Sequence, residues 1–129
     1  MDYGLEIGMN YTIEHIVKKD DIASVVGSGM VDVFATPAMI TLMELAARST
    51  VQSKLDSGYT TVGTMVNIEH LRATPLGASV RGHATLVSIE GRKLSFEIEA
   101  HDDKGLIGKG THSRVIIDVK RFMEGITKD

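Results

Sequence analysis

The chain of 129 residues has no cysteine, no tryptophan and only two prolines, and aromatic residues make up 5% of it. The absence of cysteine excludes disulfides, thiolate nucleophiles and cysteine-ligated zinc, and it agrees with a cytoplasmic location. No segment approaches the ~20 consecutive apolar residues of a membrane span. Residues 1–12 also lack the basic and apolar segments of a secretory signal. We therefore expect a cytoplasmic protein that does not associate with a membrane.

An excess of charge of one sign is missing as well. Charged residues make up 24% of the chain and hydrophobic residues 43%, and the formal net charge is -3. This balance is typical of a soluble globule, and it argues against a dedicated nucleic-acid binder, which would usually be basic. It leaves room for an anionic small ligand that meets a local basic cluster. The length fits one domain over residues 1–129.

The segment 36–55, TPAMITLMELAARSTVQSKL, predicts a long helix. Thr36 suits the N-cap, where its hydroxyl can accept a bond from an unpaired backbone N–H. Pro37 suits the first helical position, since its missing N–H is not needed there. Gly58 suits a stop just past the end of the helix.

Within this helix every residue from Ala38 to Ala47 is apolar except Thr41 and Glu44. A helix that is apolar on nearly all sides is expected to be buried. A carboxylate inside such a helix is costly unless a cation, a donor or a proton satisfies it. Glu44 therefore either has a dedicated partner or takes part in chemistry.

The other segments alternate between apolar and polar residues in the manner of strands. We expect a first strand at 11–17, an irregular stretch at 18–35, and four strands at 60–74, 78–90, 93–101 and 106–119. Four strands joined by short turns form an antiparallel meander, so the fold class is α+β. The sheet has to wrap around the helix. Because one helix cannot cover a whole sheet face, we expect a second copy of the chain to close an edge or a face.

His70 lies at the end of the strand at 60–74, on its apolar face. Taken alone, a histidine there is more often a hydrogen-bonded core residue than a catalyst. In the same way, Thr36 alone would be a helix cap and Glu44 alone would be half of an ion pair. The other four histidines lack the spacing and the paired carboxylates of a metal site. We expect no metal ion and no cofactor.

The order of elements resembles the hot-dog fold, and the motifs resemble one branch of it, the fluoroacetyl-coenzyme A thioesterase and its relatives. The matching segments are 33–47, 63–80, 89–102 and 108–117. The pattern His-Leu-x-x-Thr-Pro-x-Gly at 70–77 is shared widely among hot-dog thioesterases. The combination of Thr36, Glu44 and His70, at spacings of 8 and 26 residues, is more specific to this branch.

This resemblance implies that the chain is an acyl-coenzyme A thioesterase for small or medium acyl groups, working as a homodimer or a dimer of dimers. It implies that Thr36, Glu44 and His70 are the catalytic set. It also implies that Gly63 lines the site beside the acyl group and that Arg114 lies near it. The alternative is a non-catalytic module that binds and senses acyl-coenzyme A.

One departure from the family concerns the acyl pocket. The fluoroacetyl enzyme carries aromatic residues before its helix, which form a hydrophobic lid over the short acyl group. The comparable segment here, 27–34, has Gly27 and Met30 in that region. Met30 would supply a flexible cap for the substrate, and Gly27 would supply no side chain. We therefore expect a more open pocket that accepts longer or bulkier acyl groups.

Thioester hydrolysis needs an activated nucleophile, a proton donor for the leaving thiolate and donors for the oxyanion. His70 suits the general base because an unperturbed histidine has a pKa of about 6.5. Glu44 would orient the imidazole, activate water or attack directly, while Thr36 would attack or polarise the thioester. Eight helical residues span ~12 Å, so the Thr36 and Glu44 side chains cannot readily touch. Either His70 bridges them or a second subunit supplies one of them.

Overall fold

The computed structural model describes residues 3–128, which form an antiparallel sheet with a long helix against it. The chain runs through β1 (Asn10–Ile16), the 3-10 helix η1 (Lys19–Asp21), α1 (Ala23–Val26), α2 (Thr36–Gln52), β2 (Tyr59–His70), β3 (Ser79–Glu90), β4 (Lys93–Asp102), β5 (Gly105–Asp118) and α3 (Val119–Thr127). The predicted α+β class is confirmed.

The strands lie in the order β1-β3-β4-β5-β2, and every neighbouring pair is antiparallel. Three of the expected meander strands, β3, β4 and β5, are joined by hairpins. The expectation that β2 would lie beside β3 is wrong, because β2 pairs with β5 instead. Residues 71–78, between β2 and β3, carry the chain across the end of the sheet. As a result β2 is an edge strand of the sheet.

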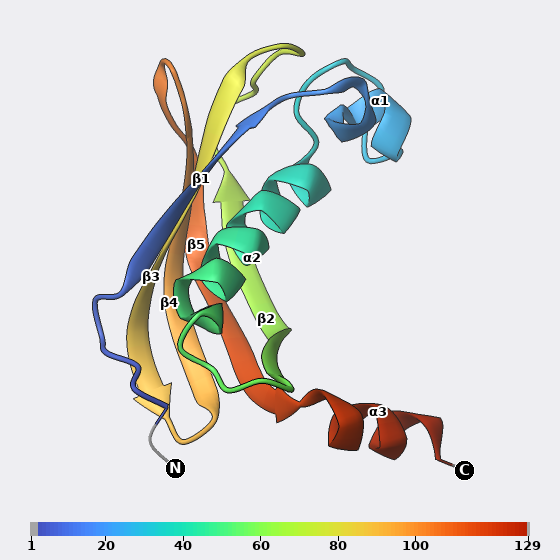
Figure 1. The fold of residues 1–129 in the computed structure, drawn as a ribbon. Helices are drawn as coiled ribbons and strands as arrows, with labels where there is room; N and C mark the ends of the chain where they lie inside the picture. Colours follow the sequence, from blue (N-terminus) through green and yellow to red (C-terminus); the bar gives the residue numbers. More distant parts are fainter. Residues whose placement is uncertain (1–2, 129) are drawn as a thin grey trace.

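The helix α2 packs against one face of the sheet (Figure 1). Its buried residues are Met39, Leu42, Met43, Ala46, Ala47, Thr50 and Val51. They belong to a core that also contains Val80, Ala84, Leu86, Leu94, Phe96, Ile98, Ile107 and Ile116 from the strands. Gly82 in β3 allows the close approach of the helix, since a Cβ there would lie 3.0 Å from the Leu42 carbonyl oxygen.

The opposite side of α2 is exposed, so the prediction of a helix buried on all sides is wrong for the single chain. The residues Pro37, Thr41, Leu45 and Arg48 form this exposed stripe, and Leu45 is 37% exposed. The physical reason is that one sheet can cover only one side of a helix. Leu45 therefore leaves apolar surface on this stripe that another protein surface can cover.

The first turn of α2 differs from the expectation in one respect. Ala35 is the N-cap residue and no side chain caps the helix, so the prediction that Thr36 caps it is wrong. Thr36 is the first helical residue, Pro37 follows it, and the Thr36 hydroxyl bonds to another element. The helix ends at Gln52 rather than at Leu55.

A β-bulge in β2 decides which side chains face the helix. The register with β5 shifts between Gly63 and Met65, so that Thr64 is an extra residue. In a regular strand, residues an odd number apart point to opposite faces. Gly63 and His70 are an odd number apart, and the bulge restores both to the face that α2 covers. The simple alternation expected for this strand is therefore wrong at the bulge.

The C-terminal helix α3 was not expected from the sequence. The Asp118 side chain caps it by accepting a bond from the Arg121 backbone N–H at 3.2 Å. No residue of α3 is buried, and the helix extends away from the sheet (Figure 1). Across residues 3–128, no helix has the length and apolar character needed to cross a membrane.

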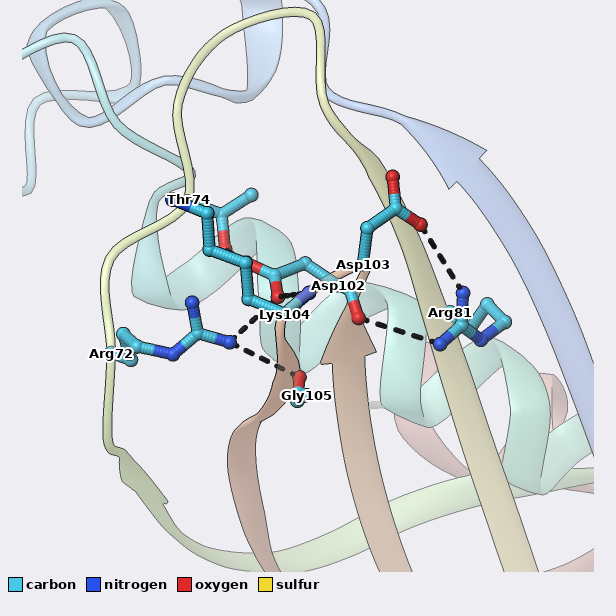
Figure 2. Close-up of polar contacts among 7 residues, drawn as sticks. All are labelled: Arg72, Thr74, Arg81, Asp102, Asp103, Lys104 and Gly105. Carbon is cyan, nitrogen blue, oxygen red and sulfur yellow. Dashed lines mark hydrogen bonds and ion pairs between the residues drawn. The ribbon is translucent and has the colours of Figure 1, made fainter.

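The turn between β4 and β5 is built on the buried carboxylate of Asp102, which is 5% exposed (Figure 2). Arg72 Nη2 and the Lys104 backbone N–H donate to Oδ1 at 2.6 and 2.8 Å. The Thr74 hydroxyl donates to Oδ2 at 3.0 Å. Burial alone would raise the pKa of Asp102, but the bonds from Arg72, Lys104 and Thr74 outweigh it and hold the pKa below 3.8. This cluster ties the segment after His70 to the β4–β5 turn.

We predict that Asp102→Asn lowers the free energy of unfolding at neutral pH by about 1.5–3 kcal/mol, the usual range for hydrogen bonds to a charged group. Because the pKa of Asp102 is lower in the folded state, this contribution is present above the unfolded pKa of about 3.9 and is lost as the pH falls through the folded value. Urea unfolding at neutral pH and at low pH measures both limits. Parent and variant should converge in acid.

The matched control is Asp103→Asn, because the neighbouring Asp103 is 80% exposed and pairs with Arg81 only at 3.8 Å. An exposed pair of this kind contributes little, so this variant should match the parent at both pH values. A loss in Asp102→Asn of the same size at neutral and at low pH would contradict the role given to the ionised carboxylate.

Candidate functional site

Thr36 and His70 form a hydrogen-bonded pair at one end of the molecule. The start of α2 and the end of β2 lie together there (Figure 1). The distance from Thr36 Oγ1 to His70 Nδ1 is 2.8 Å, although the two residues come from different elements. This contact has the geometry of a nucleophile beside a general base.

The imidazole of His70 is set up to accept a proton. Burial lowers the pKa of His70 below its ordinary value of 6.5, and the nearby Arg72 backbone acts in the opposite direction. The ring is therefore neutral at neutral pH and can take the Thr36 proton at Nδ1. The other ring nitrogen, Nε2, is buried and has no hydrogen-bond partner among the described residues.

A cavity of about 350 Å³ opens beside this pair. Its lining residues come from the loop before α2, from the first turn of α2 and from the segment after β2, and they include Ser28, Gly29, Val31, Phe34, Thr36, His70, Leu71 and Arg72. The first backbone N–H groups of a helix have no acceptor within the helix, and the helix dipole favours negative charge there. An oxyanion formed beside Thr36 would therefore meet favourable partners.

A larger depression, of about 450 Å³, lies elsewhere and is a poorer candidate. It is lined by Glu69, Glu97 and Glu99 beside Lys109, on strands β2, β4 and β5. A wall rich in carboxylates repels an anionic ligand. No nucleophile–base pair lies in this depression.

Glu44 belongs to a second polar centre, near the middle of α2. Its Oε2 lies 3.9 Å from Arg114 Nη1, and its side chain is 37% exposed. Arg114 is 6% exposed. Its Nε donates to Thr61 Oγ1 at 2.7 Å, and its Nη2 donates to the Thr61 carbonyl at 2.8 Å. Glu44 is therefore half-exposed rather than buried as the apolar helix predicted, and the buried group of this pair is Arg114.

Gly63 is the point of β2 closest to this second centre. A Cβ on Gly63 would lie 2.9 Å from Glu44 Oε2 and 3.5 Å from Arg114 Nη1. Glycine leaves this space open between the strand and the two charges. The structure thus brings Gly63, Arg114 and Glu44 together.

The two centres are separate within one chain. Thr36 bonds His70 at one end of α2, and Glu44 pairs with Arg114 two helical turns further on. No hydrogen bond or ion pair joins Glu44 to His70 among the described residues. Met30 is 97% exposed and does not line the cavity, although its neighbours Gly29 and Val31 do.

His112 is a residue that the sequence reasoning passed over. It is fully buried, its Nδ1 lies 2.7 Å from the Met65 carbonyl oxygen, and its Nε2 lies 3.2 Å from Arg114 Nη1. The available signal was its position two residues before Arg114 in a strand, which places both on one face. Among residues 3–128, no group of three or more His, Asp or Glu side chains is arranged to hold a metal ion.

The chain is similar to several known proteins. Residues 17–120 match the profile of a family described as fluoroacetyl-CoA-specific thioesterase, FlK. A fluoroacetyl-CoA thioesterase from Streptantibioticus cattleyicolor is 42% identical over 91 residues, which span 70% of this chain and 66% of that enzyme. The crystal structure of the fluoroacetyl-CoA thioesterase FlK superposes with a TM-score of 0.92 at 32% identity, over 98% of both chains.

Two further structures extend this similarity. A thioesterase superfamily member from Thermus thermophilus has a TM-score of 0.87 at 28% identity, over 95% of this chain and 91% of that one. A hot-dog-like protein from Thermanaerovibrio acidaminovorans has a TM-score of 0.89 at 21% identity, over 99% and 96% of the two chains. The fold is therefore the hot-dog fold, as the order of elements predicted.

The space at Gly63 yields a direct test. We predict that Gly63→Ala displaces the Glu44 carboxylate from Arg114, because the new methyl group would meet Glu44 Oε2 at 2.9 Å. The end of a glutamate side chain can move, so the free energy of unfolding should stay within about 1 kcal/mol of the parent value. A crystal structure and a urea titration of the variant measure the two effects.

Gly125→Ala is the control, since no heavy atom lies within 4 Å of a Cβ there. It should leave both the position of Glu44 and the stability of the sheet unchanged. If Glu44 does not move in Gly63→Ala, the strand β2 has shifted instead of the carboxylate. That result would contradict the prediction that the carboxylate is the group that moves.

Proposed function

Because the chain belongs to the fluoroacetyl-CoA-specific thioesterase family, we propose that it hydrolyses acyl-coenzyme A thioesters of small or medium acyl groups to the free acid and coenzyme A. The observation that carries this proposal is the 2.8 Å contact between Thr36 Oγ1 and His70 Nδ1 beside an open cavity. The enzyme acts as one hot-dog domain in the cytoplasm, without a metal ion or a cofactor.

In the proposed reaction Thr36 is the nucleophile and His70 is the general base. Thr36 Oγ1 attacks the thioester carbonyl carbon while its proton passes to His70 Nδ1. The oxyanion of the tetrahedral intermediate faces the first turn of α2. The C–S bond then breaks, and His70 returns the proton to the leaving coenzyme A thiolate. Water hydrolyses the acyl-Thr36 ester by the same route, with His70 again taking the proton.

Glu44 does not serve the Thr36–His70 pair of its own chain in this proposal. The separation of the two centres along α2 is ~12 Å, too long for direct contact. We assign the Glu44 that completes each site to a second copy of the chain, where it orients or activates the attacking water. Arg114 and Gly63 line the space beside the acyl group.

The acyl pocket in this proposal is open rather than closed by a rigid lid. Met30 is 97% exposed and lies between Gly29 and Val31, two residues that line the cavity. Gly27, with a positive φ of 96°, ends α1 and adds no side chain. An unbranched Met side chain adapts to ligands of different size. In this proposal Met30 turns inward over a bound acyl group as a flexible cap, and the pocket accepts acyl groups longer than fluoroacetyl.

A panel of acyl-coenzyme A thioesters tests the function. We expect the parent to hydrolyse acetyl, fluoroacetyl, butyryl, hexanoyl and phenylacetyl thioesters, with kcat/KM rising a few-fold per added carbon until the pocket ends. The physical reason is that each buried methylene contributes about 0.8 kcal/mol at most. His70→Ala should reduce kcat by ~10²-fold or more, as expected when a general base is removed.

Two outcomes of this panel would count against the proposal. Tight binding of every thioester without turnover would identify a sensing module instead. A sharp preference for fluoroacetyl over acetyl, with the longer groups rejected, would keep the thioesterase and overturn the open pocket.

A homodimer, or a dimer of dimers, is the assembly that we propose. The edge strand β2 carries exposed Met65 and Val66, which are 43% and 37% exposed. The stripe of α2 that includes Leu45 is uncovered as well. An unpaired apolar edge strand favours pairing with another strand, and a second copy of the chain brings an identical edge that can pair about a twofold axis.

We predict a particle of at least twice the chain mass by light scattering at micromolar concentration. Met65→Lys should shift this particle towards the monomer, because a charge on an edge strand opposes pairing. Val87→Lys is the control, since Val87 has a similar exposure of 38% in β3, away from the β2 edge. A monomeric parent would overturn the assembly and, with it, the second-copy role of Glu44.

A further inference from the structure

His112, to which the proposed reaction gives no role, lies at the centre of a buried polar network. Its ring is fully buried on β5 and packs against Phe96, with 6.2 Å between the ring centroids. A carbonyl oxygen can only accept, so Nδ1 carries the proton in the 2.7 Å bond to Met65. A guanidinium can only donate, so Nε2 offers its lone pair to Arg114 Nη1 at 3.2 Å. The imidazole is therefore held neutral in one tautomer.

The charges that face this ring agree with the neutral form. Burial lowers the pKa of His112 below 6.5, and the charge of Arg114 adds to this effect. The bond to the Met65 carbonyl and the charge of Glu44 act in the opposite direction, without reversing it. From α2, Glu44 and Arg48 are the charged residues that act on Arg114 itself.

The guanidinium of Arg114 is clamped on both sides. On one side, Nε donates to the Thr61 hydroxyl at 2.7 Å and Nη2 donates to the Thr61 carbonyl at 2.8 Å. On the other side, Nη1 donates to His112 Nε2. The same Nη1 atom forms the ion pair with Glu44. At 3.9 Å, the Arg114–Glu44 approach is too long for a hydrogen bond. Arg114 thus neutralises the carboxylate without occupying its oxygen atoms.

We propose that His112 is a positioning residue of the thioesterase site, because its Nε2 holds Arg114 back from Glu44 and keeps the carboxylate oxygens free for substrate or water. The inference rests on the proposed function. Without an acceptor at this place, the buried Nη1 would lose a partner, and a buried donor left unpaired is costly. Glu44 Oε2 is an acceptor that lies 3.9 Å from the same atom. Arg114 would then turn towards Glu44, pair with it directly and withdraw it from the reaction.

Two substitutions separate the two bonds of His112. In His112→Asn the amide stands near the place of Nδ1, so the bond to Met65 is kept and the acceptor for Arg114 is lost. In His112→Gln the longer side chain brings an amide oxygen near the place of Nε2, so the acceptor for Arg114 is kept. A role in packing alone would make both variants equal, whereas the proposed role makes them differ.

We expect His112→Asn to lower kcat on the preferred thioester by at least about tenfold and His112→Gln to stay within about threefold of the parent, with KM little changed in both. A crystal structure of His112→Asn should show Arg114 Nη1 in hydrogen-bond contact with Glu44, whereas His112→Gln should keep the longer separation. His112→Phe keeps the ring beside Phe96 without an acceptor, and it replaces the Asn variant if that variant does not fold. Thr50→Val, which removes a buried hydroxyl bonded within α2, controls for destabilisation and should keep the parent kcat.

Equal kcat for Asn and Gln variants of matched thermal stability would overturn the inference, as would an Arg114 that stays in place in His112→Asn. The structural comparison does not require turnover. If the parent hydrolyses no thioester, the proposed function fails, while the movement of Arg114 still decides whether His112 holds it.

Discussion

The bulge at Thr64 is the constraint on which the arrangement of the site depends. Without this extra residue, Gly63 and His70 would point to opposite faces of β2, because side chains alternate along a strand. With it, both face the helix. The bulge also stands at the point where the Met65 carbonyl meets His112. Because of this bulge, the Thr36–His70 pair and the Glu44–Arg114 pair lie on the same face of the sheet, the one that α2 covers.

The buried cation at Arg114 explains why this inner surface contains so many polar groups. A guanidinium that is 6% exposed needs acceptors for its N–H groups and a nearby negative charge. Thr61 and His112 supply the acceptors, and Glu44 supplies the charge. Each partner comes from a different element. The polar network therefore depends on the packing of α2 against β2 and β5, and it constrains the register of these strands in return.

Sequence reasoning reached the hot-dog fold because the hydrophobic periodicity changes clearly from the helix at 36–55 to the strands that follow. It placed Thr36, Glu44 and His70 through family resemblance, since each residue alone has an ordinary structural reading. It did not foresee that β2 pairs with β5, because periodicity gives the existence of strands and not their neighbours. It also passed over His112, whose importance comes from a carbonyl and a guanidinium that are distant in sequence.

The sequence by itself determined the α+β class and the long apolar helix, because both follow from local patterns of apolar residues. Only the tertiary structure decided which partner Glu44 has and that the Thr36 hydroxyl bonds His70 instead of capping its helix. It also decided that the bulge turns Gly63 and His70 to one face. Each of these depends on contacts between residues far apart in the chain, which local pattern does not encode.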